Sequence, residues 1–465
     1  MDAPLHEIAC DRQDAAAPAL AHHWADGSVD RLSFGDLALA SRALASRLSE
    51  AGVRAGARVA IALPQAPLHP VAHLACSRVG AITVPLSPML GADALTPRLA
   101  RAAPTLALVD ASRAEAFRAA DPALPLWIAQ GRNLRTTRGT LPAREAAPLS
   151  PRPLSLFFTS GTTAEPKCVA LPRGVVAGRM PGFRRAHPEA SRFWSPAEWS
   201  WIGGLHDALF APWIAGLCVV SAQREGRFDP AAAARLIEAE RVDAAFLPPT
   251  ALKRWRASGL PAPRLASLHA AGEPLQPAAR AWAEAGAAVR EVYGLTECAF
   301  VLLDGEPVNS ARVELDRGEV RVAAGAPTMM LGYVEDGEAR LPLDADGFFR
   351  TGDEAREEGG RLRVVGRLDD IIKSSGYRIS PGEVEAALLR HPAVAECAVV
   401  GVPDEARGHA VKAFVKLADG ARADAEALRA HVRDHAGAYM TPREVVFVDA
   451  LPQTVNGKLL RRHLR

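Results

Sequence analysis

The chain has 465 residues with 55 basic and 53 acidic side chains, giving a net charge of +2 at pH 7, and 49% of its residues are hydrophobic. This composition is typical of a folded protein and provides no basic field for binding nucleic acid. Since the chain is too long for one compact core, we expect a large domain and a smaller one.

The sequence also argues against several other classes of protein. The six cysteines are scattered without a CxxC pair, so neither a zinc site nor a disulfide framework is expected. Residues 1–14 lack the basic start and the apolar stretch of a signal peptide. The most apolar window, Trp201–Val220, contains His206, Asp207 and Pro212, which are costly in lipid. We therefore expect a cytoplasmic enzyme without a membrane span.

Up to about residue 300, short β-rich runs alternate with alanine-rich helical stretches. This alternation predicts a large domain of α/β subdomains with mainly parallel strands. In chain order, the predicted elements are helix Phe34–Ala51, strands Val59–Leu63, Ile82–Leu86, Thr105–Val109 and Leu154–Phe158, helix Pro230–Glu240, and strands Ala244–Leu247 and Val289–Val292.

Beyond Gly318 the pattern changes to strand-like pieces with glycine turns, which predicts a small β subdomain. We place the domain boundary within Gly366–Asp370, dividing 1–366 from a small mobile α+β domain at 367–465. A capping box is expected from Ser380 to Glu383. The other elements predicted here are strands Glu319–Val322, Gly347–Arg350, Arg361–Val365, Val394–Val402 and Val411–Leu417, and helix Ala425–His435 ended by Gly437.

The first motif that suggests chemistry is the segment Thr159–Lys167, TSGTTAEPK, directly after a predicted strand. Its backbone N–H groups, hydroxyls and lysine are the parts that hold a polyphosphate. It is not a Walker A loop, because no Gly-Lys-Ser/Thr follows. Taken alone, the segment fits a polar surface turn equally well.

The second motif is Tyr293–Glu297, YGLTE, at the end of another predicted strand. The carboxyl ends of parallel strands are where open α/β sheets bind ligands. A glutamate there can hold Mg²⁺ against phosphate oxygens. Since any strand can end in Gly-x-Thr-Glu, the motif is weak by itself.

Three further motifs follow: Thr351–Asp353, Gly366–Arg378 and Pro452–Lys458. An aspartate at a turn suits a pair of ribose hydroxyls, and an arginine can add to that site or meet a phosphate. Each segment could separately be a turn or linker with solvated charges. Five such segments in this order would seldom arise from independent surface turns.

With these motifs the chain resembles the adenylate-forming superfamily of acyl-CoA synthetases, peptide-synthetase adenylation domains and luciferases over nearly its whole length. Ala271–Leu275 looks like the adenine-side segment of that family. Trp199–Gly204 and Phe246–Leu252 look most like short- and medium-chain acyl-CoA synthetases. The resemblance implies ATP-dependent activation of a small carboxylic acid to acyl-AMP, with release of pyrophosphate, and transfer of the acyl group to the thiol of coenzyme A.

The resemblance assigns the nucleotide contacts position by position. It implies that Lys167, Thr296 and Glu297 contact phosphate, with Glu297 also holding Mg²⁺. It implies that Asp353 and Arg367 bind the ribose. The other nucleotide-contacting residues that it implies are Thr159, Ser160, Gly161, Thr162, Thr163, Gly272, Glu273, Pro274 and Tyr293.

The resemblance also assigns residues to acyl transfer and to the acid. Lys458 would bridge the carboxylate and the α-phosphate, Asp369 would be the hinge, and Gly376 and Arg378 would belong to the thiol channel. Acetate-specific relatives carry a tryptophan where this chain has Gly294, which implies an acid larger than acetate. The implied acid pocket consists of Trp201, Ile202, Gly203 and Gly294.

Two departures from the family pattern leave alternatives open. Ala164 stands where the phosphate loop usually has a second glycine, and only 21 residues separate Glu297 from Glu319. One alternative is loading of the acid onto the phosphopantetheine of an acyl- or peptidyl-carrier protein acting in trans. Another is a catalytically weakened, nucleotide-binding regulatory protein.

Overall fold

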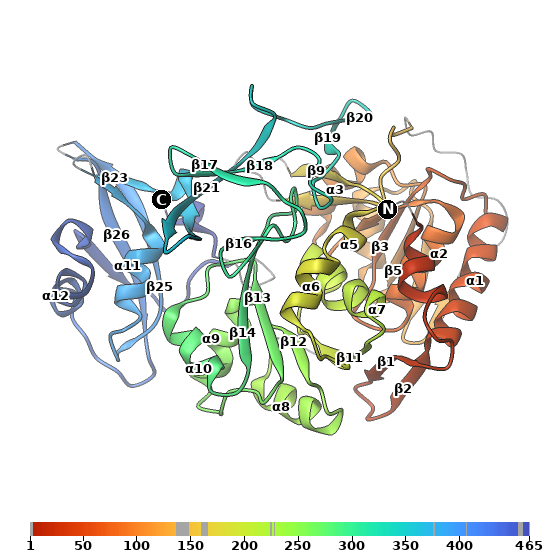
Figure 1. Cartoon of the computed structure of the whole chain (residues 1–465), viewed down its shortest axis with the longest axis horizontal. Helices are drawn as coiled ribbons and strands as arrows, with labels where there is room; N and C mark the ends of the chain where they lie inside the picture. The colour runs from red at the N-terminus through yellow and green to blue at the C-terminus, as the bar shows by residue number, and fades with distance from the viewer. Residues whose placement is uncertain are drawn as a thin grey trace. The chain divides into compact units, whose positions relative to one another are not determined.

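The structure is a computed structural model of the chain, and it describes residues 3–135, 148–159, 166–223, 226, 228–374, 377–405, 407–453 and 459–464. The chain forms two compact units, whose elements are labelled in Figure 1. Unit 1 comprises Met1–Val313 and Val322–Phe349, and unit 2 comprises Glu314–Arg321 and Arg350–Arg465. The hinge boundary expected at 366/367 stays a prediction, and the division between the compact units lies earlier in the chain.

One large sheet of unit 1 has the strand order β20-β19-β9-β8-β4-β3-β5-β6-β7. Strands β8, β4, β3, β5 and β6 pair in parallel, and β9 and β19 continue the sheet antiparallel. Both β3 and β5 are apolar runs, as expected of strands buried on both faces. The strands are β3 (Arg58–Ala62), β4 (Ile82–Pro85), β5 (Leu106–Asp110), β6 (Leu126–Gln130), β7 (Asn133–Arg135), β8 (Ser155–Thr159), β9 (Lys167–Leu171), β19 (Gly332–Glu335) and β20 (Glu338–Arg340).

The other large sheet of unit 1 has the order β16-β15-β14-β13-β12-β10-β11-β1-β2, with a parallel centre from β14 to β1. Strands β15, β16 and β2 extend its two edges antiparallel. The strands are β1 (Pro18–His23), β2 (Val29–Ser33), β10 (Arg192–Trp194), β11 (Cys218–Ala222), β12 (Ala244–Phe246), β13 (Ser267–Ala271), β14 (Ala288–Tyr293), β15 (Leu302–Leu303) and β16 (Glu306–Pro307).

Helices connect and cover these strands, and α1 and α2 lie side by side (Figure 1). The α-helices are α1 (Phe34–Glu50), α2 (Leu68–Val79), α3 (Ala92–Ala102), α4 (Ala114–Ala120), α5 (Val175–Gly178), α6 (Met180–Ala186), α7 (Ala211–Ile214), α8 (Pro230–Ala239), α9 (Pro249–Ala257) and α10 (Pro277–Glu284). The segments Glu7–Asp11 and Gly203–Phe210 are π-helical, and Ala111–Arg113 is a 3₁₀ turn. All the strands and helices predicted before residue 300 are confirmed within one residue at each end, and so is the α/β class.

Unit 2 contains most of a sheet of order β17-β18-β21-β22 and a second sheet in which β24-β23-β26-β25 is extended by β27. The long pairing of β21 with β22 holds these two strands together, and Arg356 of β21 pairs with Glu383 of the C-terminal region. The elements are β17 (Val313–Asp316), β18 (Glu319–Ala323), β21 (Phe348–Glu358), β22 (Arg361–Arg367), β23 (Ile372–Ser374), β24 (Tyr377–Ile379), α11 (Pro381–Leu388), β25 (Val394–Asp404), β26 (Gly408–Leu417), α12 (Ala425–Ala436) and β27 (Glu444–Phe447), with 3₁₀ turns at Leu368–Asp370, Ala438–Met440 and Arg461–His463.

Two helix starts show where local patterns succeed and fail. At α1 the Ser33 hydroxyl accepts from the Asp36 N–H at 3.1 Å, and the Asp36 carboxylate accepts from the Ser33 N–H at 2.9 Å, which is a complete capping box. The capping box predicted at Ser380 is wrong. The Ser380 hydroxyl donates instead to the Val365 carbonyl at 3.2 Å, and Glu383 pairs with an arginine of β21.

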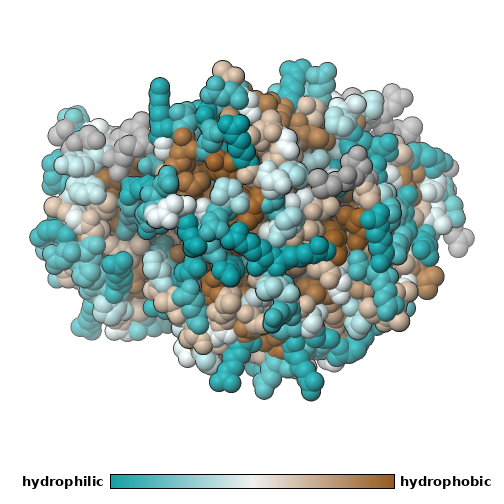
Figure 2. Space-filling model, viewed as in Figure 1, coloured by the Kyte–Doolittle hydropathy of each residue, from teal (hydrophilic) through white to brown (hydrophobic). Residues whose placement is uncertain are grey.

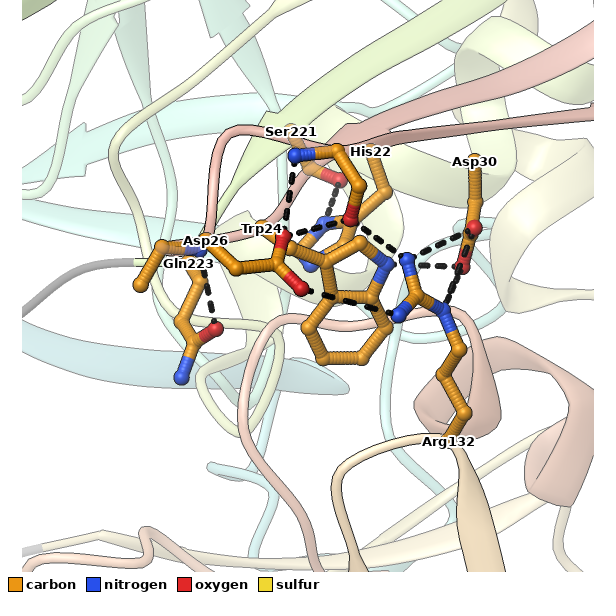
Figure 3. A network of polar contacts seen from close by, with 9 residues as sticks. His22, Trp24, Asp26, Asp30, Arg132, Ser221 and Gln223 are labelled. Carbon is orange, nitrogen blue, oxygen red and sulfur yellow. Dashed lines mark hydrogen bonds and ion pairs between the residues drawn. The ribbon is translucent and has the colours of Figure 1, made fainter.

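A polar network joins the ends of the two large sheets of unit 1 at their edge strands β2 and β7 (Figure 3). Arg132, in the turn before β7, donates to both oxygens of Asp30 on β2 at 3.0 to 3.2 Å. Its guanidinium lies 4.5 Å from the centroid of the Trp24 ring, and the Trp24 indole N–H also donates to Asp30 at 2.7 Å. One arginine therefore links the hairpin β6–β7 to the hairpin β1–β2.

On the face shown in Figure 2, hydrophilic residues cover much of the surface, with apolar residues exposed between them. Within the described ranges, no helix is both long enough and apolar enough to cross a membrane.

Candidate active site

The phosphate-loop motif connects two antiparallel neighbours in unit 1. Thr159 is the last residue of β8 and Lys167 the first of β9, and the two residues are paired across the ladder. Residues 160–165, which include the predicted Ser160, Gly161, Thr162 and Thr163, lie outside the described residues. The exposed Lys167 directs its ammonium group to the Tyr333 ring, 4.8 Å from the ring centroid.

The Tyr293–Glu297 motif begins at the end of β14, as predicted, and Thr296 and Glu297 are half-buried. The Glu297 carboxylate accepts a hydrogen bond of 2.9 Å from the Tyr333 hydroxyl. The Glu297 carbonyl accepts from the Met330 N–H at 2.7 Å. Backbone and side chain of Glu297 are thus both held by the segment that leads into β19.

Gly294, which was expected to belong to the acid pocket, lies where the backbone approaches itself closely. A Cβ atom at this position would lie 2.2 Å from the Phe300 nitrogen and 3.0 Å from the Ala299 carbonyl carbon. The space where a side chain would start is therefore filled by backbone and is not open to a substrate. The glycine instead lets the chain turn back on itself after β14, where the Val301 N–H donates to the Tyr293 carbonyl at 2.9 Å.

The predicted acid-pocket and adenine-side segments meet at the indole of Trp201. Its ring lies 2.8 Å from where a Cβ of Gly203 would be and 3.3 Å from that of Gly272. Gly272 also has φ +99°, which favours glycine. The Trp201 ring packs on Phe246 of β12 at a centroid distance of 5.6 Å, and Ile202 is buried. Tryptophan thus forms an apolar wall beside Gly272.

The neighbouring residues Glu273 and Pro274 complete the adenine-side segment. Pro274 is exposed and Glu273 is half-buried. The Leu275 N–H that follows donates to a carboxylate oxygen of Glu291 on β14 at 2.9 Å, which ties the segment to the adjacent strand.

Three buried polar side chains form a hydrogen-bonded chain next to Phe246, which was not predicted from the sequence. His187 contacts the Ser267 hydroxyl through Nδ1 and His269 through Nε2, both at 2.6 Å, and the His269 ring stacks on Phe246 at 4.6 Å. Burial lowers the pKa of His187 to about 3 and that of His269 well below its usual value. Both rings are therefore neutral near pH 7. No sequence pattern indicated that these residues would meet.

In unit 2 the structure brings the third and fourth motifs together. Asp353 on β21 is 5% exposed and is paired across the ladder with Arg367 on β22. An Arg367 guanidinium N–H donates to Asp353 Oδ1 at 3.2 Å and to the Thr351 carbonyl at 3.0 Å. Gly352 has φ +72°, and a Cβ there would lie 3.2 Å from the guanidinium. A carboxylate and an arginine are thus fixed at a glycine turn, where the absence of a side chain leaves room for the guanidinium.

The remaining predicted residues lie in unit 2 or outside the described residues. Asp369 lies in the 3₁₀ turn directly after β22, and the backbone of Arg378 pairs with that of Lys373 between β24 and β23. Gly376 and Lys458 lie outside the described residues. The segments flanking 454–458 meet, since Gln453 bridges to Leu459 and the Leu460 N–H donates to the Pro452 carbonyl at 2.9 Å.

Residues 7–360 match the family model described as AMP-binding enzyme, and residues 383–458 match the AMP-binding enzyme C-terminal domain. The chain belongs to the AMP-binding enzyme family. This AMP-binding enzyme is 33% identical over 477 residues to a feruloyl-CoA synthase from Amycolatopsis sp, with 93% of each chain covered. It is 31% identical over 495 residues to 4-hydroxybutyrate–CoA ligase 1 from Metallosphaera sedula, covering 95% of this chain and 86% of the relative.

A solved structure supports the same assignment for this AMP-binding enzyme. The crystal structure of an acyl-CoA synthetase from Brucella canis matches with a TM-score of 0.71 and 31% identity, covering 100% of this chain and 94% of that chain. The chain is therefore an adenylate-forming, acyl-CoA synthetase-like ligase. The expected family and enzyme class are confirmed.

Proposed function

We propose that this enzyme activates a carboxylic acid larger than acetate with ATP and transfers the acyl group to the thiol of coenzyme A. The observation that carries the proposal is the Asp353–Arg367 pair at the Gly352 turn, because a buried carboxylate held beside an arginine suits the paired hydroxyls of a ribose. The match of nearly the whole chain to CoA ligases supports the same reading.

The chemistry needs no side-chain nucleophile. A carboxylate oxygen of the acid attacks the α-phosphorus of ATP, the bond from that phosphorus to pyrophosphate breaks, and acyl-AMP forms. The thiol sulfur then attacks the acyl carbon, the carbon–oxygen bond to AMP breaks, and the thiol proton leaves to solvent. Lys167, Thr296 and Lys458 would supply positive charge and hydrogen bonds to the oxygens where charge develops.

Magnesium fits the residues of unit 1. The Glu297 carboxylate accepts the Tyr333 hydroxyl through its Oε1 oxygen, and the half-buried side chain offers a second oxygen. Within the described ranges, no group of three or more His, Cys, Asp and Glu side chains could hold a metal ion. A single carboxylate such as that of Glu297 suits Mg²⁺, because this ion is usually held by one or two carboxylates together with water and substrate phosphates. Bound there, the ion would neutralise charge on the phosphates.

The acid is proposed to be larger than acetate on the basis of the Trp201 wall. Trp201 and Phe246 present apolar rings next to the adenine-side glycine, and the buried Ile202 adds aliphatic surface. The methyl group of acetate would leave this apolar wall largely uncovered. Named relatives act on ferulate and on 4-hydroxybutyrate, so we propose a panel of aromatic and aliphatic acids for the test.

The test is acid-dependent exchange of pyrophosphate into ATP over that panel, followed by addition of coenzyme A or of a phosphopantetheinylated carrier protein. We expect exchange with at least one acid of four or more carbons, and thioester formation with coenzyme A. Thioester on the carrier alone would favour the carrier-loading alternative. Nucleotide binding without exchange for any acid would favour a regulatory protein and overturn the proposed function.

A further inference from the structure

Tyr333 touches two residues of the adenylation site, although no motif pointed to it. It lies on β19, opposite Val169 of β9, and Lys167 lies two residues earlier on the same strand. Its hydroxyl donates to Glu297 Oε1 at 2.9 Å, while its ring lies 4.8 Å from the Lys167 ammonium. One side chain thus meets both the lysine of the phosphate loop and the glutamate proposed to face the metal.

The backbone fixes Tyr333 relative to both partners. The Leu331 N–H donates to the Ala170 carbonyl on β9 at 2.8 Å, and the Met330 N–H donates to the Glu297 carbonyl at 2.7 Å. Gly332 has φ +148°, and a Cβ there would come within 2.5 Å of the Arg340 backbone, so β20 packs against this turn. The Tyr333 ring is therefore set by strand pairing on one side and by the Thr-Glu segment on the other.

The chemistry of the three groups suggests why a tyrosine is needed there. A lysine and a glutamate in one small site would neutralise each other by forming an ion pair. Among the described residues, both charged groups contact Tyr333, and no ion pair joins Lys167 to Glu297. The ring face attracts the ammonium through its quadrupole, and the hydroxyl satisfies the carboxylate.

We propose that Tyr333 is a positioning residue for adenylation: its hydroxyl orients Glu297 toward Mg²⁺, and its ring holds Lys167 for the phosphates, so that the two charges serve the nucleotide and do not pair with each other. This inference rests on the proposed function. It predicts that the hydroxyl and the ring of Tyr333 have separable effects. The hydroxyl acts on Mg²⁺ through Glu297, and the ring acts on the phosphates through Lys167.

The test compares Tyr333→Phe, which keeps the ring, with Tyr333→Leu, which removes both contacts. Pyrophosphate exchange is measured against Mg²⁺ and against ATP, and binding of ATP with Mg²⁺ is measured by calorimetry. For Tyr333→Phe we expect the half-saturating Mg²⁺ concentration to rise roughly three- to tenfold, as for loss of one hydrogen bond, with little change in KM for the acid. For Tyr333→Leu we expect a further rise of about threefold or more in KM for ATP.

Tyr439→Phe is the matched control, since it removes a hydroxyl from an exposed tyrosine of unit 2 and should leave all three parameters unchanged. In a Glu297→Gln background, Tyr333→Phe should have no further effect on the Mg²⁺ dependence, which tests the coupling directly. The inference is overturned if Tyr333→Phe keeps the wild-type Mg²⁺ dependence, or if it changes every parameter equally while lowering the melting temperature. A wild-type protein without exchange would instead defeat the proposed function, and calorimetry would then still decide the role of Tyr333.

Discussion

Asp353, which we propose to bind the ribose, is also part of the hydrogen-bonded fold of unit 2. Its carboxylate is buried and held by Arg367, and the backbone N–H of Asp353 donates to the Thr351 hydroxyl at 3.1 Å. The Thr351 hydroxyl in turn donates to the Val320 carbonyl on β18 at 2.7 Å. The orientation of the aspartate is therefore set before any ligand binds.

We predict that Asp353→Ala weakens the use of ATP mainly through binding. A carboxylate that accepts two ribose hydroxyls contributes equally in the ground and transition states, so its loss raises KM more than it lowers kcat. Lost charge-assisted bonds cost about 1.5 to 3 kcal/mol, which corresponds to roughly ten- to a hundredfold in KM for ATP. Steady-state kinetics of pyrophosphate exchange provides the measurement, with the exposed Asp434→Ala as control. A collapse of kcat at unchanged KM would contradict the assignment.

At the scale of elements, the turn after β14 decides where Thr296 and Glu297 lie. We predict that Gly294→Ala lowers both the melting temperature and the rate of adenylation, because its methyl group would overlap the Phe300 backbone. The loss of stability should be about 1 to 3 kcal/mol. The control is Gly91→Ala, where a Cβ meets nothing within 4 Å. A Gly294→Ala protein with wild-type melting temperature and activity would show that the turn adapts.

The same turn illustrates which features could be predicted from sequence. Alternating apolar runs and helical stretches were enough to locate strands such as β3 and β5, because burial on both faces leaves a clear composition. Ordered motifs were enough to expect Asp353 near Arg367. The partners of Tyr333 and of His269 could not be expected, since such contacts depend on which distant strands become neighbours. The close backbone approach at Gly294 could not be expected from the sequence either, and the capping box at Ser380 was wrong because a tertiary acceptor captured its hydroxyl.

At the scale of the whole molecule, buried histidines should make the fold sensitive to acid. Burial lowers the pKa of His22 and His69 to about 4 and that of His187 to about 3, and it places those of His73, His206 and His269 well below the usual value. Unfolded histidines titrate near 6.5, so between that pH and the folded pKa values the unfolded chain binds more protons. The stability from these groups is present above about pH 6.5 and is lost as the pH falls.

We therefore predict that the free energy of unfolding of unit 1 decreases steeply below pH 6.5, by up to about 1.4 kcal/mol per pH unit for each such histidine. Urea unfolding followed between pH 7.5 and 4.5 provides the measurement. Replacing the exposed His409 by asparagine should leave the profile unchanged. A flat profile down to pH 5 would mean that these rings are protonated in the folded state.

The two half-reactions should also be separable, because the family resemblance assigns them to different segments of the C-terminal region. We predict that Lys458→Ala abolishes acyl-AMP formation while leaving thioester formation from supplied acyl-AMP nearly intact. Gly376→Leu should do the reverse by filling the thiol channel. Pyrophosphate exchange and thioester assays on the same preparations, with circular dichroism as the folding control, give the measurement. Equal damage to both half-reactions in both variants would contradict alternating use of the C-terminal region.

The Arg132 network has a consequence for how the molecule behaves at high concentration. Among the described residues, strands β2 and β7 each form one of the two edges of their sheet, and an unpaired edge is a template on which another chain can add a strand. Here each edge hairpin is held against the other by an arginine, an aspartate and a tryptophan (Figure 3), and β2 and β7 carry the charges of Asp30, Arg31 and Arg135. The contact that joins the two sheets therefore also protects their edges from intermolecular strand addition.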